Sequence, residues 1–348
     1  MSLGPVMVDL AGTDISEIEK DLLQNPNVGG VILFTRNFES VEQITALISE
    51  IHALRLPHLL IAIDHEGGRV QRFHEGFTRL PPVAVFGDMY KHDPKQARRC
   101  AEQAGWLMAV ELRAIGVDFS FAPVLDLAHG VSGVIGNRAF HGNPRTAATL
   151  AYAFMHGMNE AGMSAVGKHF PGHGGVAEDS HLALPVDRRD IDSLMNEDIV
   201  PFAHMIENGL PAIMPAHVIY EKVDSRPAGY SKIWLQDILR KRLKFQGVIF
   251  SDDLTMEAAC IAGSYGERAE QALAAGCDMV LVCNHTDGAL EVVEHLQGYS
   301  NPASQLRLAR MHGRGSVQRE RLLASERWHA ASEQVAKLDE SPWLEMDV

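Results

Sequence analysis

The chain has 348 residues, 46% of them apolar, which is enough for one large domain or two ordinary ones. Its formal net charge of −14 argues against a general binder of nucleic acids or anionic membranes, although a local basic pocket for a small anionic substrate is compatible with it. Four dispersed cysteines without a CxxC pair indicate reduced thiols, and no run of about 18 apolar residues predicts a membrane span. The first residues lack a basic segment followed by an apolar one, so we expect no signal peptide and a cytoplasmic location.

Short apolar runs recur along the chain and are predicted to form strands buried on both faces, because they are rich in Val, Ile, Leu or Phe without strict alternation. The predicted strands are 5–10, 29–34, 59–64, 117–123, 163–170, 212–218, 247–253 and 278–284. Amphipathic helices are expected between them. The predicted helices are 40–54, 94–115, 144–161, 190–208, 231–243 and 264–275. Ser40 and Gln43 predict a capping box, and Gly162 and Gly276 predict helix C-caps.

Strands that alternate with helices predict a single-domain α/β fold, the (β/α)₈ TIM barrel, over residues 1–290. A doubly wound open sheet is the main rival, but the GxGxxG and GxxxxGK[ST] phosphate-binding motifs of such sheets are missing. Residues 291–348 are charged and helical in pattern, and we expect them to form a C-terminal extension packed on the barrel.

Charged and polar side chains follow five of the predicted strands. They are Asp64 with the HEGGRVQR segment, Lys168 and His169, His217, Ser251 with Asp252 and Asp253, and Asn284 with His285. Charged groups at the ends of buried strands are costly unless they are paired or used. In a TIM barrel the carboxyl ends of the strands form one active-site face. The sequence therefore predicts an enzyme with a polar pocket at this face.

Each of these residues also has a structural alternative. We expect Asp253 to cap a helix beginning at Leu254, and Glu66 and Arg69 to pair with each other as scaffolding. Structural roles are also open for Asp64, His217 and Arg138.

The segment KHFPGHGGVAEDSHLALP gathers protonatable side chains on what prolines and glycines indicate is a loop. These side chains are Lys168, His169, His173, Asp179 and His181. Zinc binding by the histidines and Asp179 is one interpretation, but zinc ligands usually sit close together on a rigid element, and no cysteine pair assists here. Proton transfer is the preferred interpretation, because a carboxylate two residues from His181 can orient the imidazole and favour its protonated form. Asp252 is the candidate nucleophile across the pocket.

Three motifs occur in a fixed order: DHEGGRVQRF, then KHFPGHG followed by DSH, then FSDDLTM. Together they resemble the bacterial β-N-acetylglucosaminidases of glycoside hydrolase family 3, and most of all the cytoplasmic members of cell-wall recycling. The likeness runs from about Val6 to His285. It implies that Asp252 is the nucleophile and that His181 is the general acid/base, with Asp179 as its dyad partner. It further implies that the sugar is held by Asp64, Arg72, Arg138, Lys168 and His169.

The resemblance implies a retaining exo-β-N-acetylglucosaminidase that acts in peptidoglycan recycling through a covalent glycosyl-enzyme intermediate. The implied substrate is N-acetylglucosamine β-linked to 1,6-anhydro-N-acetylmuramic acid, with or without its peptide. A cofactor, a metal, a nucleic acid and a membrane are not expected, and a monomer is the working expectation. The alternatives are a phosphorylase at the same site, a metal-dependent TIM-barrel hydrolase and a non-catalytic sugar-binding module.

Overall fold

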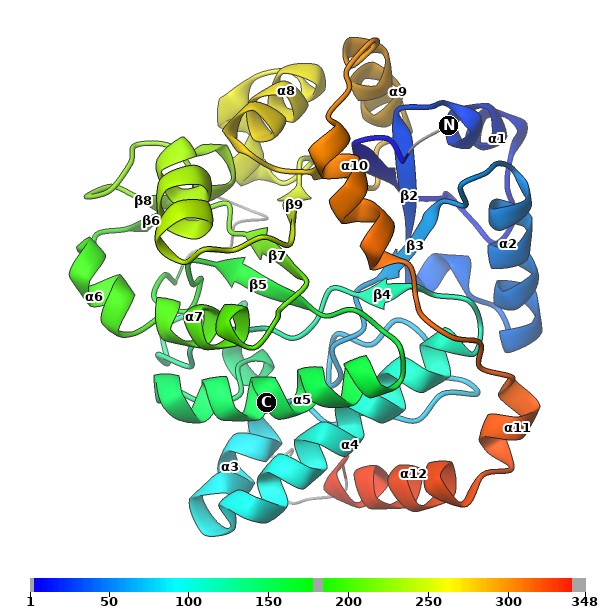
Figure 1. Ribbon diagram of the computed structural model, residues 1–348, viewed down its shortest axis with the longest axis vertical. Helices are drawn as coiled ribbons and strands as arrows, with labels where there is room; N and C mark the ends of the chain where they lie inside the picture. The colour runs from blue at the N-terminus through cyan, green and yellow to red at the C-terminus, as the bar shows by residue number, and fades with distance from the viewer. Residues whose placement is uncertain (1–2, 178–183, 340–348) are drawn as a thin grey trace.

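A computed structural model describes residues 3–177 and 184–339 and shows a barrel of parallel strands surrounded by helices (Figure 1). The strands are β1 (Val6–Val8), β2 (Val28–Leu33), β3 (Leu60–Ile63), β4 (Phe119–Ser120), β5 (Val166–Phe170), β7 (Ala212–Pro215), β9 (Val248–Asp253) and β10 (Met279–Val282). Their order in the sheet is β4-β3-β2-β1-β10-β9-β7-β5. Parallel bridges from Phe119 to Ser164 and from Val124 to Lys168 join the two edge strands. The predicted α/β barrel is therefore confirmed, and the open-sheet rival is excluded.

Helices cover the outside of the barrel (Figure 1). They are α1 (Glu17–Gln24), α2 (Val41–Ala53), α3 (Ala84–His92), α4 (Pro94–Arg113), α5 (Pro144–Glu160), α6 (Ile191–Asn196), α7 (Ile199–Glu207), η4 (Ile233–Arg242), α8 (Tyr265–Ala275) and α9 (Thr286–His295). Short 3₁₀ elements are η1 (Thr35–Asn37), η2 (Gly136–Arg138), η3 (Ala228–Tyr230), η5 (Glu257–Ala262) and η6 (Ala309–Met311). Every predicted helix is present, but the one predicted over 190–208 is divided into α6 and α7.

The predicted helix ends are present with one difference. Gly162 and Gly276 have φ angles of 80° and 132°, the left-handed region that glycine favours at a C-cap. The Ser40 hydroxyl accepts a hydrogen bond from the Gln43 amide at 3.1 Å, as the predicted cap requires. The Gln43 side-chain oxygen, however, accepts from the Glu39 amide instead of the Ser40 amide, so the capping box is only half formed.

Three further helices follow the barrel: α10 (Pro302–Leu308), α11 (Arg319–Leu323) and α12 (Glu326–Asp339). The indole of Trp328 in α12 donates a hydrogen bond of 2.8 Å to Glu111 in α4, which ties this helix to the outer layer (Figure 1). The domain boundary predicted at residue 290 falls inside α9, and the division into 1–290 and 291–348 stays a prediction.

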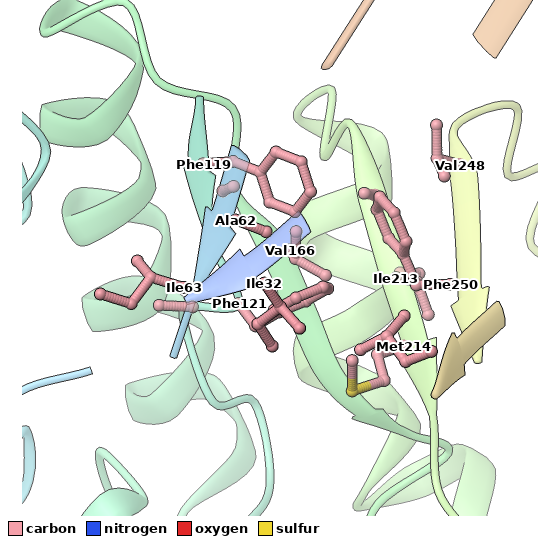
Figure 2. Close-up of a cluster of buried hydrophobic side chains, with 14 of the residues drawn as sticks. Ile32, Ala62, Ile63, Phe119, Phe121, Val166, Ile213, Met214, Val248 and Phe250 are labelled. Carbon is pink, nitrogen blue, oxygen red and sulfur yellow. The ribbon is translucent and has the colours of Figure 1, made fainter. Parts of the chain in front are cut away.

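The barrel interior is filled by apolar side chains from several strands, some of which Figure 2 shows. Phe119, Phe121 and Phe250 form a compact aromatic cluster with ring centroids 5.2 to 5.3 Å apart. Side chains two residues apart on a strand point to the same face. Asp252 follows Phe250 by two residues and lies at the carboxyl end of β9, above this cluster in the chain direction. The packed core thus forms a floor beneath the predicted active-site face.

A small second sheet lies beyond this end of the barrel. It pairs β6 (Val186–Asp187) with β8 (Ile219–Tyr220) in parallel. Its strands are only two residues long, and the sequence pattern does not predict them.

Candidate active site

A pocket of about 240 Å³ lies at the carboxyl ends of the strands. Residues that were predicted at separate points of the sequence line it together. They are Asp64, Arg72, Arg138, Lys168, His169 and Asp252. The polar residues of the strand ends therefore do converge, although the contacts of each one with a sugar stay predictions. Asp179 and His181 lie outside the described residues.

Lys168 joins two carboxylates of the pocket. Its ammonium group lies 2.7 Å from Asp64 Oδ1 and 2.7 Å from Glu66 Oε1, and the side chain is almost fully buried. Arg72 approaches the same Asp64 carboxylate at 3.8 Å. Burial alone would lower the pKa of Lys168, but Asp64 and Glu66 raise it above its ordinary value. The pocket therefore contains a fixed positive charge between carboxylates, which suits a neutral polyhydroxylated ligand.

Glu66 is a central acceptor of the pocket, and its predicted pairing with Arg69 is wrong. Arg138 donates to both Glu66 oxygens at 2.8 Å, in addition to the contact of Glu66 with Lys168. Burial alone would raise the pKa of Glu66, but the charges of Lys168 and Arg138 hold it well below its usual range. Arg69 instead donates to the carbonyl groups of residues 133 and 134. Glu66 therefore pairs with Lys168 and Arg138 and not with Arg69.

The neighbouring acids Asp252 and Asp253 have different surroundings. The Asp253 carboxylate accepts from the Thr255 amide at 3.0 Å, the Thr255 hydroxyl at 2.7 Å and the Cys283 amide at 3.1 Å. Burial raises the pKa of Asp253 to about 6. Asp253 thus caps the turn after β9, while the helix expected to begin at Leu254 is replaced by that turn and η5. Asp252 accepts from the Asp253 amide at 2.9 Å and lines the pocket.

Asp126 contacts the pocket residues His169 and His173, and it was not predicted. It is fully buried, lies 2.7 Å from His169 Nδ1, and accepts from the His173 amide at 2.7 Å. This contact fixes the orientation of His169, so that Nε2 is the ring nitrogen left for the pocket. Burial alone would raise the pKa of Asp126, but the neighbouring histidines lower it. The sequence feature that could have indicated Asp126 is an acidic residue three positions beyond the predicted strand 117–123, in the sequence PVLDL.

His217 has the structural role that was left open for it. It is fully buried, stacks on Tyr230 with ring centroids 5.5 Å apart, and lies 3.1 Å from the Asp253 carbonyl through Nε2. Burial lowers the pKa of His217, which favours the neutral imidazole. His217 therefore contacts the strand end that carries Asp252 and Asp253.

One group of potential metal ligands occurs within residues 3–177 and 184–339: His129, Glu197 and Asp198. Arg189 Nη1 lies 2.5 Å from Asp198 Oδ2 and 3.7 Å from Glu197. The Arg189 guanidinium group therefore already supplies the positive charge beside these carboxylates. The zinc interpretation of the 168–185 segment involves residues outside the described chain and stays a prediction.

A (β/α)₈ barrel with a pocket of paired carboxylates and cations at its strand ends has the arrangement of a TIM-barrel enzyme. Residues 4–311 match the model of the glycosyl hydrolase family 3 N-terminal domain. The chain therefore belongs to glycosyl hydrolase family 3.

Known relatives agree with this assignment over 90% or more of the chain. The Beta-hexosaminidase of Thioalkalivibrio sulfidiphilus is 61% identical and covers 100% of both chains. The Beta-hexosaminidase of Methylobacillus flagellatus is 56% identical over 90% of both. The crystal structure of NagZ from Neisseria gonorrhoeae in complex with N-trifluoroacetyl-D-glucosamine is similar with a TM-score of 0.93, 48% identity and coverage of 98% and 99%.

Proposed function

We propose that the chain is a retaining exo-β-N-acetylglucosaminidase that uses Asp252 as its nucleophile. At the level of reaction class it is a glycoside hydrolase of the β-N-acetylhexosaminidase type, as its family and its full-length relatives establish. The observation that carries the finer proposal is the position of Asp252. It lies at the carboxyl end of β9 and lines the pocket, and the carboxylate of its neighbour Asp253 caps the following turn through three hydrogen bonds.

The pocket suits the transition state of glycoside hydrolysis. That transition state carries positive charge near the anomeric carbon, and a fixed carboxylate stabilises it. Asp252 would attack this carbon and form an ester with the sugar, which water later hydrolyses. Glu66, Asp64 and Lys168 form a rigid set of donors and acceptors for the hydroxyl and acetamido groups.

His181 would give a proton to the leaving oxygen and later accept one from water, with Asp179 orienting its imidazole. Both residues lie outside the described chain, so their roles rest on the DSH motif alone. A neutral imidazole close to the sugar would also tolerate phosphate as the attacking group. Phosphorolysis is therefore the competing outcome that a test has to distinguish.

The proposed substrate carries terminal β-linked N-acetylglucosamine on a peptidoglycan fragment with 1,6-anhydro-N-acetylmuramic acid. The relative from Neisseria gonorrhoeae, whose complex contains an N-acylated glucosamine, supports the sugar part of this proposal. Within the part of the chain that the structure describes, none of the helices is long and apolar enough to cross a bilayer. We place the reaction in the cytoplasm as part of the same proposal.

The test measures turnover of an aryl N-acetyl-β-glucosaminide by wild type, Asp252→Ala and Asp253→Asn. We expect Asp252→Ala to reduce kcat by about 10³-fold or more, because the covalent step is lost. Asp253→Asn is expected to retain far more activity, since Asp253 acts through the turn. Proton NMR of the first product in water should show the β-anomer, and phosphate buffer should yield no sugar 1-phosphate. Equal turnover by wild type and Asp252→Ala would remove Asp252 from the mechanism.

A further inference from the structure

A charged cluster lies beside the segment that leaves β5 and returns to β6. Its members are His129, Asp187, Arg189 and Asp198, and we call it the anchor cluster. Arg189 is central: Nη2 lies 2.6 Å from Asp187 Oδ2, and Nη1 lies 2.5 Å from Asp198 Oδ2. His129 Nε2 lies 3.0 Å from the other oxygen of Asp198. Both aspartates are buried, while the side chains of Arg189 and His129 are partly exposed.

The outgoing arm of this segment, residues 171–177, rests directly on the anchor cluster. A Cβ atom on Gly172 would lie only 2.6 Å from Cβ of Asp198, and one on Gly175 would collide with the Arg189 guanidinium. The Gly172 carbonyl also accepts a hydrogen bond of 2.8 Å from the hydroxyl group of Tyr220, and the Tyr220 side chain is fully buried. The glycines therefore let the backbone approach the cluster more closely than any side chain would allow.

The returning arm, residues 184–189, contributes to the same cluster. Asp187 and Arg189 belong to it, and β6 is held in place by parallel pairing of Asp187 with Tyr220 in β8. Tyr220 thus touches both arms, one through its backbone pairing and one through its hydroxyl. His129 adds a third segment, because it follows β4 in the chain and precedes the pocket residue Arg138.

The ion pairs of the cluster are expected to be rigid. Burial alone would lower the pKa of Arg189, but the hydrogen bonds and charges of Asp187 and Asp198 raise it above its ordinary value. Arg189 is therefore expected to be protonated, as arginine side chains in proteins are. Removing it would leave two buried carboxylates without their main partner, which is costly.

We propose that Arg189 and Asp198 are positioning residues for the proton-transfer step. They fix the two chain arms that flank residues 178–183, and that stretch contains Asp179 and His181 by sequence. Neither Arg189 nor Asp198 lines the pocket, so they act through the chain and not on the sugar. This inference rests on the proposed function, because it requires His181 to be the proton donor.

Leaving-group dependence tests the proposal. The parameter kcat/KM reports the first chemical step, and that step needs a proton donor only when the leaving group is poor. We would compare 2,4-dinitrophenyl and phenyl N-acetyl-β-glucosaminides in wild type, His181→Ala, Arg189→Ala and Asp198→Asn. Arg188→Ala is the matched control, because Arg188 is the neighbouring cation, with an 81% exposed side chain, and pairs only loosely with Glu221.

We expect His181→Ala, Arg189→Ala and Asp198→Asn each to lose at least about tenfold more kcat/KM on the phenyl substrate than on the dinitrophenyl substrate. Arg188→Ala should retain its kcat/KM on both substrates. Equal losses on both substrates in the Arg189 and Asp198 variants would reduce the cluster to a structural role. If this occurs while His181→Ala keeps its selective loss, only the positioning proposal fails. If His181→Ala shows no selectivity, the acid/base assignment itself fails, and the positioning proposal fails with it.

Should Arg189→Ala not fold, Asp198→Asn decides the matter, because it keeps the shape of the side chain and removes only the charge. Thermal melts of each purified variant identify the folded ones before kinetics are compared. A folded Asp198→Asn enzyme with wild-type kinetics on the phenyl substrate would overturn the proposal.

Discussion

Single residues at the strand ends differ in how visible their roles are in the sequence. Asp64, Lys168 and Asp252 are recognisable because each is a charge at the end of an apolar run. Glu66 was misassigned because its nearest cation along the chain, Arg69, is not its nearest cation in space. Arg138 lies 72 residues away in sequence and donates to both of its oxygens. Pairings of this kind depend on strand order and cannot be read from local spacing.

The charge of Glu66 gives a testable dependence of stability on pH. Its folded-state pKa is depressed, so its contribution to stability is present above its unfolded value of 4.5 and is lost as pH falls below it. The unfolding free-energy difference between wild type and Glu66→Gln should therefore shrink by about 1 kcal/mol from pH 4.5 to pH 3.5, because the unfolded Glu66 carboxyl goes from half protonated to mostly protonated over this range. Urea denaturation at several pH values measures this difference.

Glu160→Gln is the control for that experiment, because Glu160 pairs with Arg327 at 2.7 Å with a largely exposed geometry. An exposed pair contributes at most about 1 kcal/mol, so its pH dependence should be small. A difference between wild type and Glu66→Gln that stays constant or grows on acidification would contradict the charge network described for the pocket.

At the scale of elements, the strands and the long helices were predictable, and the short elements were not. The apolar runs of the strands and the 3.6-residue periodicity of α2 can be recognised in the sequence without knowledge of the fold. Helix α1, EIEKDLLQ, is largely polar and offers few apolar positions to such a pattern. Helix α3 contains Gly87, and a glycine in a sequence indicates the end of a helix. In the structure Gly87 lies inside the helix against the backbone of Phe140, where a side chain would not fit. The two-residue strands β6 and β8 are too short to carry any pattern.

Helix α8 offers a prediction at this scale, because its capping box is complete. The Ser264 hydroxyl accepts from the Glu267 amide, and Glu267 accepts from the Ser264 amide at 2.8 Å. We expect Ser264→Ala to lower the free energy of unfolding by about 1 kcal/mol, measured by urea denaturation, with kcat/KM unchanged. Ser49→Ala, an exposed position inside α2, should have almost no effect. Equal stability of the two variants would show that the Ser264 cap contributes nothing.

At the scale of the whole molecule, the barrel brings residues that are distant in the sequence together in one pocket. Parallel strands present all their carboxyl ends on one face, so charges separated by more than 180 residues, such as Asp64 and Asp252, line the same cavity. The fold class could be predicted because it depends on the alternation of elements alone. The pocket contacts could not, because Asp126 and Glu66 act through partners that only the closed barrel brings together. The catalytic roles follow from the motifs and stay predictions.

The most direct test of the central claim is to trap the covalent intermediate. A 5-fluoro N-acetylglucosaminyl fluoride should slow hydrolysis of the ester enough for detection, and peptide mass spectrometry then locates the attached sugar. The account predicts a single label on the peptide that contains Asp252, with no label in Asp252→Ala. A label on any other residue, or turnover with inversion and no labelled enzyme, would contradict it.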